Sequence, residues 1–407
     1  MLGGPGKADE HAQQQVAPPP AYEAHQSRRP DEQAAAGALT VAVAGLSDRG
    51  QVRPINEDAF LVASLDLGLR GLGPELVRHV VGARGSVLAV CDGMGGAAHG
   101  EIASAIAVDA LLDALAAASL LASDRAARAR VLAAAVETAH RKVHAAGRRE
   151  RRLRGMGTTL SAALIGGDAL VVAQVGDSRA YLLRRGQLTQ LTRDQTVAAA
   201  LERAGAGVSG WRQSAQADAH TVLQALGVSS EVEVSLSIVE LRRGDRLLLC
   251  SDGLHGLVPD PLLEQDLAAA LSPAAACATL LARALHAGAS DNVTVVVAEL
   301  DGEGLVLPGA EELPRFVEFA PNGRAGHALY TTSRVAHRLA RRAGLALQAT
   351  SELPTLPAAE ERALLAHGDL APAAVLAPPR PSLNRRTWGL VSLLLVGVAV
   401  ALAAVLR

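Results

Sequence analysis

The chain of 407 residues is poor in aromatic side chains, which make up only 2% of it. A hydrophobic core must therefore be built mainly from alanine, valine and leucine, and the aromatic platforms on which single-stranded nucleic acids stack are nearly missing. The formal net charge is −2, so the chain also lacks the basic excess that is typical of nucleic-acid-binding proteins. We therefore expect no nucleic acid among its partners.

Cysteine is scarce as well, and the three present are Cys91, Cys250 and Cys277. An odd number without metal-binding spacing argues against a disulfide framework and predicts a reducing compartment. The same spacing argues against a zinc site made of cysteine and histidine. Cys91 and Cys250 each lie beside a candidate functional aspartate, but we interpret both as small buried strand residues.

The first 37 residues lack the apolar core and the small-residue cleavage site of a signal peptide. They are rich in alanine, glutamine and proline and follow neither a helical nor a strand period, so we expect 1–37 to be disordered. The chain as a whole is 49% hydrophobic, which is enough for a sizeable core elsewhere.

The central feature of the sequence is the stretch Val87–Glu101, in which an apolar run ends at Asp92 and a group of glycines precedes a helical pattern. The run predicts a buried strand, and Gly93 and its neighbours permit a tight turn whose carbonyl groups approach an ion or a substrate. For one such site taken alone, a turn that merely needs glycine explains the pattern equally well.

The arrangement recurs, because Asp177, Asp252 and Asp291 also stand among turn residues beside apolar strands. Strands of one sheet end along a common edge, so these carboxylates and Asp92 can converge, and buried carboxylates repel one another unless cations neutralise them. Oxygen ligands of this kind suit Mg²⁺ or Mn²⁺. The alternative is a set of separate aspartate turns.

The rest of the pattern predicts strands joined mostly by short turns and helices that come in groups, which is the α+β class with antiparallel sheets covered by helices. We expect one folded domain over 38–300, large enough for an enzyme, with a surface loop at 66–84. Helices are expected over 100–118 and 124–146, the second ending at Gly147. Residues 194–218 predict a helix and a flap-like loop, and a plain surface loop is the alternative.

Residues 301–387 are rich in proline and alanine and show no second core, so they predict a mostly disordered linker. The segment Trp388–Leu406 then follows without a single charge. Its helical length of about 30 Å would cross a bilayer. More arginines precede this segment than follow it, which favours a single-pass membrane anchor with the remaining chain in the cytoplasm. A buried core helix is the competing interpretation.

Six motifs occur in a fixed order: SDRGQVRPINEDAF, CDGMGGAAHGE, GMGTTL, VGDSRAYLLR, CSDGLHGLV and ASDNVTVVV. Over residues 39–300 the sequence thereby resembles the metal-dependent protein serine/threonine phosphatases of the type 2C family, and especially the bacterial branch, which has methionine at the position of Met94. The resemblance implies a sandwich of two antiparallel sheets flanked by helices on both faces. It also implies a binuclear Mn²⁺ or Mg²⁺ centre that activates water to hydrolyse phosphoserine and phosphothreonine.

The resemblance implies roles for particular residues. Asp92 corresponds to the carboxylate that bridges both metal ions, and the Gly93 carbonyl to a ligand of one of them. Asp252 and Asp291 correspond to ligands of the other ion.

Further correspondences lie outside this set. Arg53 matches the arginine that grips the substrate phosphate, a role that its planar fork suits. Glu57 matches a residue that holds metal-bound water, and Asp58 one that supports the site. Asp177 matches an aspartate that helps to bind a third, weaker metal ion.

The sequence departs from the family pattern at two places. Met94 replaces the histidine that some members are thought to use as general acid, and we expect nearby His99 to face solvent. Asp194, Gln195 and Thr196 stand where the family commonly has Asp-His-Ser. The leading hypothesis is a membrane-tethered phosphatase that acts on phosphoproteins and opposes a serine/threonine kinase. The alternatives are a catalytically inactive binding module and an adaptor that works through its tail.

Overall fold

The computed structural model describes residues 38–95, 99–120, 124–203 and 221–320. The expectations for 1–37, for the flap beyond residue 203, for most of the linker and for Trp388–Leu406 lie outside these ranges. Among the helices in the described ranges, none combines the length and the hydrophobicity that a membrane-spanning segment requires.

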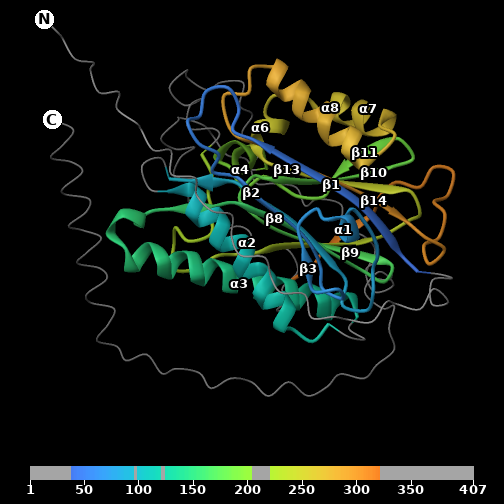
Figure 1. Ribbon diagram of the computed structural model, residues 1–407, viewed down its shortest axis with the longest axis horizontal. Coiled ribbons are helices and arrows are strands. Elements are labelled where there is room, and N and C mark those ends of the chain that lie inside the picture. Colours follow the sequence, from blue (N-terminus) through green and yellow to red (C-terminus); the bar gives the residue numbers. More distant parts are fainter. Residues whose placement is uncertain (1–37, 96–98, 121–123, 204–220, 321–407) are drawn as a thin grey trace, which may run out of the picture. The chain divides into compact units, whose positions relative to one another are not determined.

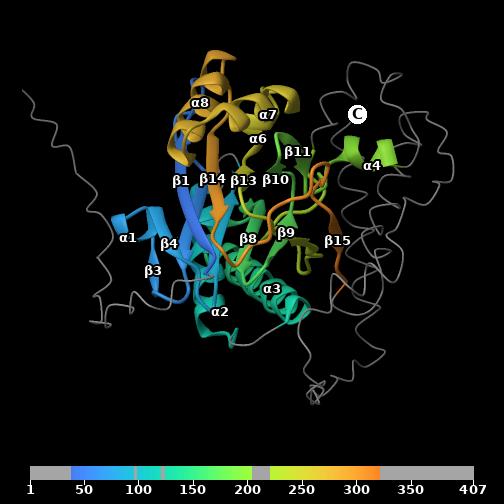
Figure 2. The same ribbon diagram turned by 90° about the vertical axis from the view of Figure 1, so that its right-hand side faces the viewer.

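Two antiparallel sheets form the centre of the fold (Figures 1 and 2). Within the described residues the first sheet has the strand order β11-β10-β13-β14-β1-β4, with the bounds β11 Gln187–Gln190, β10 Arg179–Arg184, β13 Asp245–Cys250, β14 Val293–Asp301, β1 Thr40–Asp48 and β4 Arg78–Val80. The second has the order β15-β12-β9-β8-β5-β2-β3, with the bounds β15 Phe316–Glu318, β12 Ser235–Glu240, β9 Ala169–Val175, β8 Leu160–Gly166, β5 Ser86–Cys91, β2 Ala59–Ser64 and β3 Leu69–Arg70.

Both faces of the central strands are buried, as β5 illustrates. Successive side chains of a strand point to opposite faces. Val87 and Ala89 accordingly belong to the core under the helices, whereas Leu88 and Val90 belong to the core between the two sheets. Such a strand reads as one continuous apolar run, which is why β5 was recognisable from sequence.

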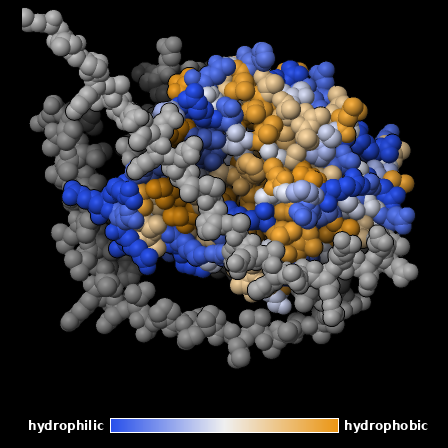
Figure 3. Space-filling view, viewed as in Figure 1, coloured by the Kyte–Doolittle hydropathy of each residue, from blue (hydrophilic) through white to orange (hydrophobic). Residues whose placement is uncertain are grey.

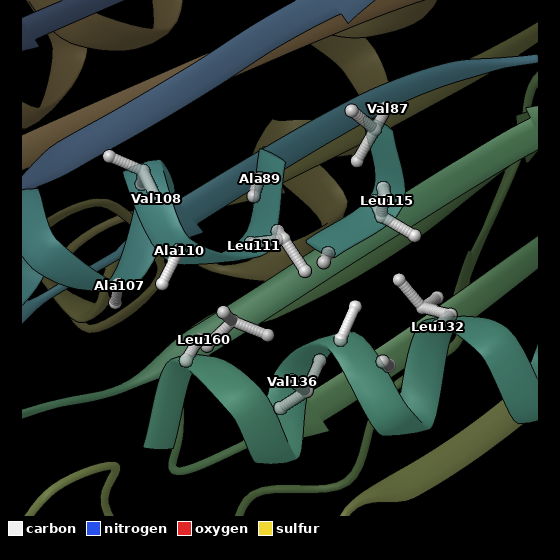
Figure 4. Close-up of a cluster of buried hydrophobic side chains, with 14 of the residues drawn as sticks. Val87, Ala89, Ala107, Val108, Ala110, Leu111, Leu115, Leu132, Val136 and Leu160 are labelled. Carbon is white, nitrogen blue, oxygen red and sulfur yellow. The ribbon is translucent and has the colours of Figure 1, made fainter. Parts of the chain in front are cut away.

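Two long helices cover the second sheet: α2 spans Gly100–Ala117 and α3 spans Arg125–Arg149. Figure 4 shows Leu111 and Leu115 of α2 and Leu132 of α3 in the cluster that also contains Val87 of β5. Asp124 caps α3 by accepting a hydrogen bond from the Ala127 N–H at 2.5 Å.

The opposite sheet is covered by α7, Asp260–Ala269, and α8, Pro273–His286. Leu263 and Leu267 of α7 and Leu280 of α8 pack with β-strand residues such as Val295 and Val297 in a third core. The layers are therefore helices, sheet, sheet and helices, and the expected α+β sandwich flanked on both faces is confirmed.

Three short helical elements complete the described fold in this part of the chain: α1 Pro74–Val77, α4 Val197–Arg203 and α6 Asp252–His255, with the 3₁₀ turn η3 at Arg151–Leu153. A small ladder pairs β6, Gly93–Met94, with β7, Gly157–Thr158. This ladder places the glycine turn after β5 against the chain that enters β8.

The structure corrects two boundaries from the sequence. Residues 66–84 contain β3, α1 and β4 rather than a plain loop, because β4 pairs with β1 and buries His79 at the sheet edge. The helix expected to stop at Gly147 continues to Arg149, so tertiary packing overrides the glycine signal there.

The ordered domain also extends beyond the expected limit at residue 300. β15 pairs with β12, and the segment before it is held by Glu312, which contacts Arg184 and Arg242. Arg184 in turn forms a buried ion pair with Asp245 at 2.7 Å. At least the stretch up to residue 320 therefore belongs to the sheet and not to a linker.

The surface of the domain mixes apolar and polar residues on the face drawn in Figure 3. Exposed apolar side chains include Leu271 at 95% and Val52 at 70%. Single exposed residues of this kind are normal for a soluble surface and identify no site by themselves.

Candidate metal centre

The predicted aspartates stand at strand ends that the two sheets bring together. Asp92 directly follows β5, and Asp58 directly precedes β2, whose Ala59 pairs with Cys91 of β5. In the other sheet Asp252 follows β13 and Asp291 precedes β14, and Cys250 pairs there with Val295. Each sheet therefore contributes two carboxylates to the same edge of the sandwich.

The carboxylates influence one another strongly. Burial raises the pKa of Asp92 well above its usual range, and the charges of Asp58 and Asp252 raise it further. Burial and the charge of Asp291 raise the pKa of Asp252, while a hydrogen bond with Asp92 lowers it. Such mutual shifts arise when several carboxylates share a poorly hydrated space without a compensating cation.

Two oxygen atoms of this cluster are buried without a hydrogen-bond partner among the described residues: Asp58 Oδ1 and Asp252 Oδ1. Native proteins rarely leave buried acceptors unsatisfied unless something else fills the role. Hard divalent cations bind such carboxylate oxygens. The donor set and its unsatisfied atoms thus fit a divalent cation.

The carboxylates lie farther apart than the ligands of a single bound metal ion. In the described part of the chain, no three His, Cys, Asp or Glu side chains lie together as closely as the ligands of one ion. Instead Asp291 Oδ2 accepts a 2.6 Å hydrogen bond from Arg53, and Asp58 Oδ2 accepts hydrogen bonds from Ser251 and Thr294. The chemistry of the cluster fits a cation, and its carboxylates are partly bonded to the protein itself.

Gly93 lies in a turn that has no room for a side chain. A Cβ atom at this position would lie 2.4 Å from the carbonyl oxygens of Glu57 and Gly100. Backbone on both sides leaves no room for a side chain, so the turn after Asp92 requires glycine. Its pairing with Thr158 in the β6–β7 ladder fixes the direction of the strand.

Asp58 is held by two hydroxyl groups. Its Oδ2 accepts hydrogen bonds from Ser251 Oγ at 2.8 Å and from Thr294 Oγ1 at 2.7 Å. Burial raises the pKa of Asp58 to about 6, and these hydrogen bonds partly offset the increase. Asp58 therefore connects the start of β2 to the end of β13 and the start of β14, and its other oxygen is buried without a hydrogen-bond partner.

Glu57 fixes the beginning of α2. Its Oε1 accepts a hydrogen bond from the Gly100 N–H at 3.1 Å, and its carbonyl accepts one from Ser104 Oγ at 2.6 Å. A carboxylate is favourable at a helix N-terminus, where backbone N–H groups are unpaired. The Glu57 N–H donates to Asn292 Oδ1 at 2.8 Å, which joins this segment to Asp291.

Arg53 lies at the open side of the cluster. Its side chain is 44% exposed, and Nη2 lies 2.6 Å from Asp291 Oδ2. The loop that carries Arg53 packs closely against residues 289–291. A Cβ atom on Gly50 would lie only 2.1 Å from the Asp291 carbonyl oxygen. Gly50 has a φ of 72°, a left-handed conformation that favours glycine.

Asp177 lies in the turn between β9 and β10 and is 7% exposed. Burial and the charge of Asp252 raise the pKa of Asp177 to about 7. The Asp177 carboxylate therefore interacts electrostatically with Asp252, although its turn joins β9 and β10 and the other aspartates lie at the ends of β2, β5, β13 and β14. The structure therefore brings Asp177 to the edge at which the other four aspartates meet.

His99 is placed differently from a simple exposed side chain. It has a φ of 63°, which is unusual for a residue other than glycine, and its Nδ1 lies 3.0 Å from Glu101 Oε1. The ring is 38% exposed. The expectation that His99 faces solvent therefore holds in part, since Glu101 covers one side of it.

Some residues of the site were missed by sequence analysis. Ser251 and Thr294 hold Asp58, and Gln195 and His255 contact the turn of Asp177. Thr294 and Asp58 are separated by 236 positions, so no local period links them. Only the proximity of Ser251, Thr294 and His255 to the aspartate motifs could have signalled these contacts.

Comparison with known proteins identifies the family of this chain. A family model described as protein phosphatase 2C matches residues 76–290, which is more than half of the chain. The chain belongs to the protein phosphatase 2C family, as its motifs predicted.

Individual relatives are bacterial. The chain is 38% identical over 268 residues to the serine/threonine protein phosphatase PstP of Mycobacterium tuberculosis strain H37Rv, covering 64% of this chain and 45% of that protein. It is 35% identical over 215 residues to the serine/threonine phosphatase stp of Listeria monocytogenes, covering 53% and 84%. The chain thus spans less than half the length of its mycobacterial relative.

Solved structures share the fold. The catalytic domain of PstP in complex with two manganese ions aligns with a TM-score of 0.52 and 37% identity, covering 65% of this chain and 99% of that one. The phosphatase Stp1 from Staphylococcus aureus aligns with a TM-score of 0.55 and 26% identity, covering 68% and 100%.

Proposed function

We propose that this chain is a protein serine/threonine phosphatase that hydrolyses phosphoserine and phosphothreonine with the help of divalent cations. The observation that carries the proposal is the buried carboxylate cluster with two unsatisfied oxygen atoms, next to an exposed arginine. Membership of the protein phosphatase 2C family and the printed activities of the relatives support it.

The proposed ligands are those that the motifs predicted. Asp92 and the Gly93 carbonyl would hold one ion, and Asp92 with Asp252 and Asp291 the other. The structure of the PstP catalytic domain with two manganese ions supports a binuclear site, and Mg²⁺ is the alternative ion. When bound, such a pair of cations lowers the pKa of a water molecule and offsets charge on the phosphoryl oxygens.

Arg53 and Asp291 form a contact that substrate would change. In the proposed reaction Arg53 leaves Asp291 and donates two parallel hydrogen bonds to the phosphate. Asp291 is then free to serve as a ligand. Because the pair is partly exposed, breaking it costs little, on the order of 0–1 kcal/mol. Substrate binding and metal binding at Asp291 would therefore support each other.

The environment of Ser251 and the cysteines argues against a covalent intermediate. The Ser251 hydroxyl is fully buried, where it donates to Asp58 and accepts a hydrogen bond from the Thr294 N–H at 2.9 Å, so a substrate phosphate has no access to it. Burial raises the pKa values of the Cys91 and Cys250 thiols. Direct attack by water is the chemistry that remains for this site.

A third, weaker cation near Asp177 is part of the proposal. The raised pKa of Asp177 and its interaction with Asp252 support a carboxylate that lacks a cationic partner. Glu57 would orient water at the main site, and Asp58 would hold the strand ends in place.

The proposed substrates are phosphorylated proteins, including a serine/threonine kinase or the proteins it phosphorylates. We further propose that Trp388–Leu406 anchors the protein in a membrane with the catalytic domain on the cytoplasmic side. The length and hydrophobicity of that segment and the arginines before it support this. The tether would raise the local concentration of the enzyme near membrane-bound phosphoproteins.

The experiment that tests the proposed function is hydrolysis of a phosphoserine peptide by the full chain and by Asp252→Asn, with and without Mn²⁺. A binding module without activity would bind phosphopeptide and release no phosphate. The predicted ligand residues are all present, and no observation specifically favours that second function.

A further inference from the structure

The turn that carries Asp177 packs on one side against Thr159, a residue that is hydrogen-bonded to the backbone of Asp92. Gly176 has a φ of 98°, and a Cβ atom there would lie 2.7 Å from the Thr159 side chain. Thr159 Oγ1 accepts a hydrogen bond from the Asp92 N–H at 3.0 Å. The Asp177 turn therefore rests on the residue that also holds the backbone of Asp92.

Gln195 holds the same turn from the other side. Its side-chain Oε1 accepts a hydrogen bond from the Gly176 N–H at 2.8 Å, and its backbone N–H donates to the Gly176 carbonyl at 3.1 Å. The Gly176 N–H is thus satisfied by the Gln195 side chain, and the Gly176 carbonyl accepts a second hydrogen bond from Gln174 Nε2 at 3.2 Å. Gln195 is 6% exposed, so water cannot readily replace these bonds.

The remaining polar groups of Gln195 bind two other segments. Its Nε2 donates to Ser235 Oγ on β12 at 3.0 Å, and its carbonyl accepts a hydrogen bond from the Leu223 N–H at 2.7 Å. Gln195 therefore joins the Asp177 turn, β12 and the chain after residue 220. The neutral side-chain amide accepts the Gly176 N–H and donates to Ser235 Oγ, and it does so at any pH because it does not titrate.

The segment around Gln195 is itself fixed to β10. Asp194 accepts two hydrogen bonds from Arg179, at 2.8 and 2.7 Å, in the paired geometry that is strong for an arginine and a carboxylate. His255 of α6 lies with Nε2 3.0 Å from the Asp177 carbonyl oxygen. The Asp177 backbone is therefore gripped from two elements before any ion is bound.

We propose that Gln195 is a positioning residue for Asp177, which it holds at the edge of the carboxylate cluster through its two hydrogen bonds to Gly176. The inference rests on the proposed function, because Asp177 is assigned there to the weaker cation. It assigns a role to a residue at which the sequence departs from the histidine of the family pattern. Outer-shell hydrogen bonds of this kind orient ligands and raise metal affinity.

The test uses Gln195→Met in the full chain, a substitution that keeps the length of the side chain, removes its hydrogen bonds to Gly176 and Ser235, and retains the backbone hydrogen bond to the Gly176 carbonyl. Hydrogen exchange of the backbone around Gly176, measured without metal, should become faster by about tenfold or more, because a buried N–H loses its acceptor. The Mn²⁺ concentration for half-maximal activity should rise by about 10-fold or more.

Three further variants separate positioning from general damage. Ser235→Ala removes only the hydrogen bond on the far side of the amide, so it should leave exchange at Gly176 nearly unchanged. Gln195→His at pH 8, where imidazole is neutral, should restore slow exchange and the Mn²⁺ dependence. In the Asp177→Asn protein, Gln195→Met should no longer alter the Mn²⁺ dependence, because the carboxylate it positions is gone.

The outcomes distinguish this inference from the proposed function. If exchange at Gly176 is the same in the wild type and in Gln195→Met, the inference is wrong whatever the activity. It is also wrong if Gln195→Met shifts the Mn²⁺ dependence equally with and without Asp177. If no metal-dependent hydrolysis is found in the wild type, the proposed function fails. Calorimetry then measures whether Gln195→Met weakens Mn²⁺ binding in the protein with Asp177 and not in the Asp177→Asn protein. Should Gln195→Met fail to fold, Gln195→His at pH 5.5 replaces it, because a protonated imidazole cannot accept the Gly176 N–H. Exchange at Gly176 should then be faster than in the wild type at the same pH, and equal exchange would contradict the inference.

Discussion

Arg53 and Asp291 illustrate how much a single pair of residues decides at this site. In the structure Arg53 forms an ion pair with Asp291, so the arginine that is proposed to bind phosphate also neutralises a proposed metal ligand. An exposed pair of this kind contributes little to stability. Its importance is therefore expected in substrate binding rather than in folding.

We predict that Arg53→Ala raises the KM for a phosphoserine peptide by about 10- to 100-fold, since charge-assisted hydrogen bonds to the phosphate are lost. Steady-state kinetics at saturating Mn²⁺ measure this. Arg70→Ala is a matched control, because Arg70 forms a similarly exposed 2.7 Å pair with Asp109 and has no role in the proposed site. An unchanged KM in Arg53→Ala would remove Arg53 from phosphate binding.

The sequence predicted the aspartates of the site better than their partners. Asp92 directly follows one apolar run and Asp252 is separated from another by Ser251 alone, so their position at strand ends followed from the pattern. The contacts of Asp58 with Ser251 and Thr294 connect residues 193 and 236 positions apart, and no local signal reports such contacts. Gln195 was noticed only as a departure from a motif, because its hydrogen bonds depend on the folded turn.

At the scale of elements, long and strongly patterned segments were predictable and short ones were not. The buried strand β5 and helix α2 follow directly from runs and periods of apolar residues. In 66–84, however, β3, α1 and β4 comprise only two, four and three residues, and pairing with β1 and β2 creates the strands. The end of α3 was misplaced because Gly147 is tolerated inside a packed helix.

Helix α3 also carries a pH-sensitive contact. His140 Nδ1 accepts a hydrogen bond from the Gly227 N–H at 3.2 Å, and His144 Nδ1 lies 3.0 Å from the Gly227 carbonyl oxygen. The two rings stack with centroids 6.1 Å apart. Burial lowers the pKa of His140, and the neighbouring His144 and Arg141 lower it further. The folded protein therefore keeps His140 neutral where the unfolded chain protonates it.

Between pH 7.5 and 5.5 the unfolded chain binds more protons at His140 than the folded protein does, so the contribution of His140 to the free energy of unfolding should fall as the pH decreases below about 6.5. In His140→Asn the side-chain oxygen can accept the Gly227 N–H without titrating, so the free energy of unfolding of this variant relative to the wild type should increase by about 1 kcal/mol from pH 7.5 to pH 5.5. Urea unfolding at both pH values measures this. His286→Asn, on an exposed turn of α8, serves as control. Equal pH dependence in the wild type and His140→Asn would contradict the role of His140.

At the scale of the whole molecule, the two sheets place carboxylates from β2, β5, β13 and β14 at one edge. The order of layers followed from the family resemblance, and continuous apolar runs such as β5 agree with it because they require a core on both faces of a strand. The continuation of the domain to residue 320 did not follow, since β15 has only three residues and depends on pairing with β12.

The proposed anchor is tested by separating membranes from the soluble fraction after expression of the full chain. We predict that the full chain sediments with membranes and that truncation before Trp388 moves it to the soluble fraction, because the apolar segment is removed. Truncation before Arg407, which leaves that segment intact, is the control. A truncated protein that still sediments with membranes would require another attachment.

The central claim is that the carboxylate cluster uses divalent cations to hydrolyse phosphoproteins. The most direct measurement is phosphate release from a phosphoserine peptide by the full chain after chelation and after re-addition of Mn²⁺, with Asp252→Asn in parallel. We predict that the wild type loses activity with chelator and regains it with Mn²⁺. Asp252→Asn should stay folded, since one repelling charge is removed, and remain inactive. Activity that persists without metal, or full activity of Asp252→Asn, would contradict the claim.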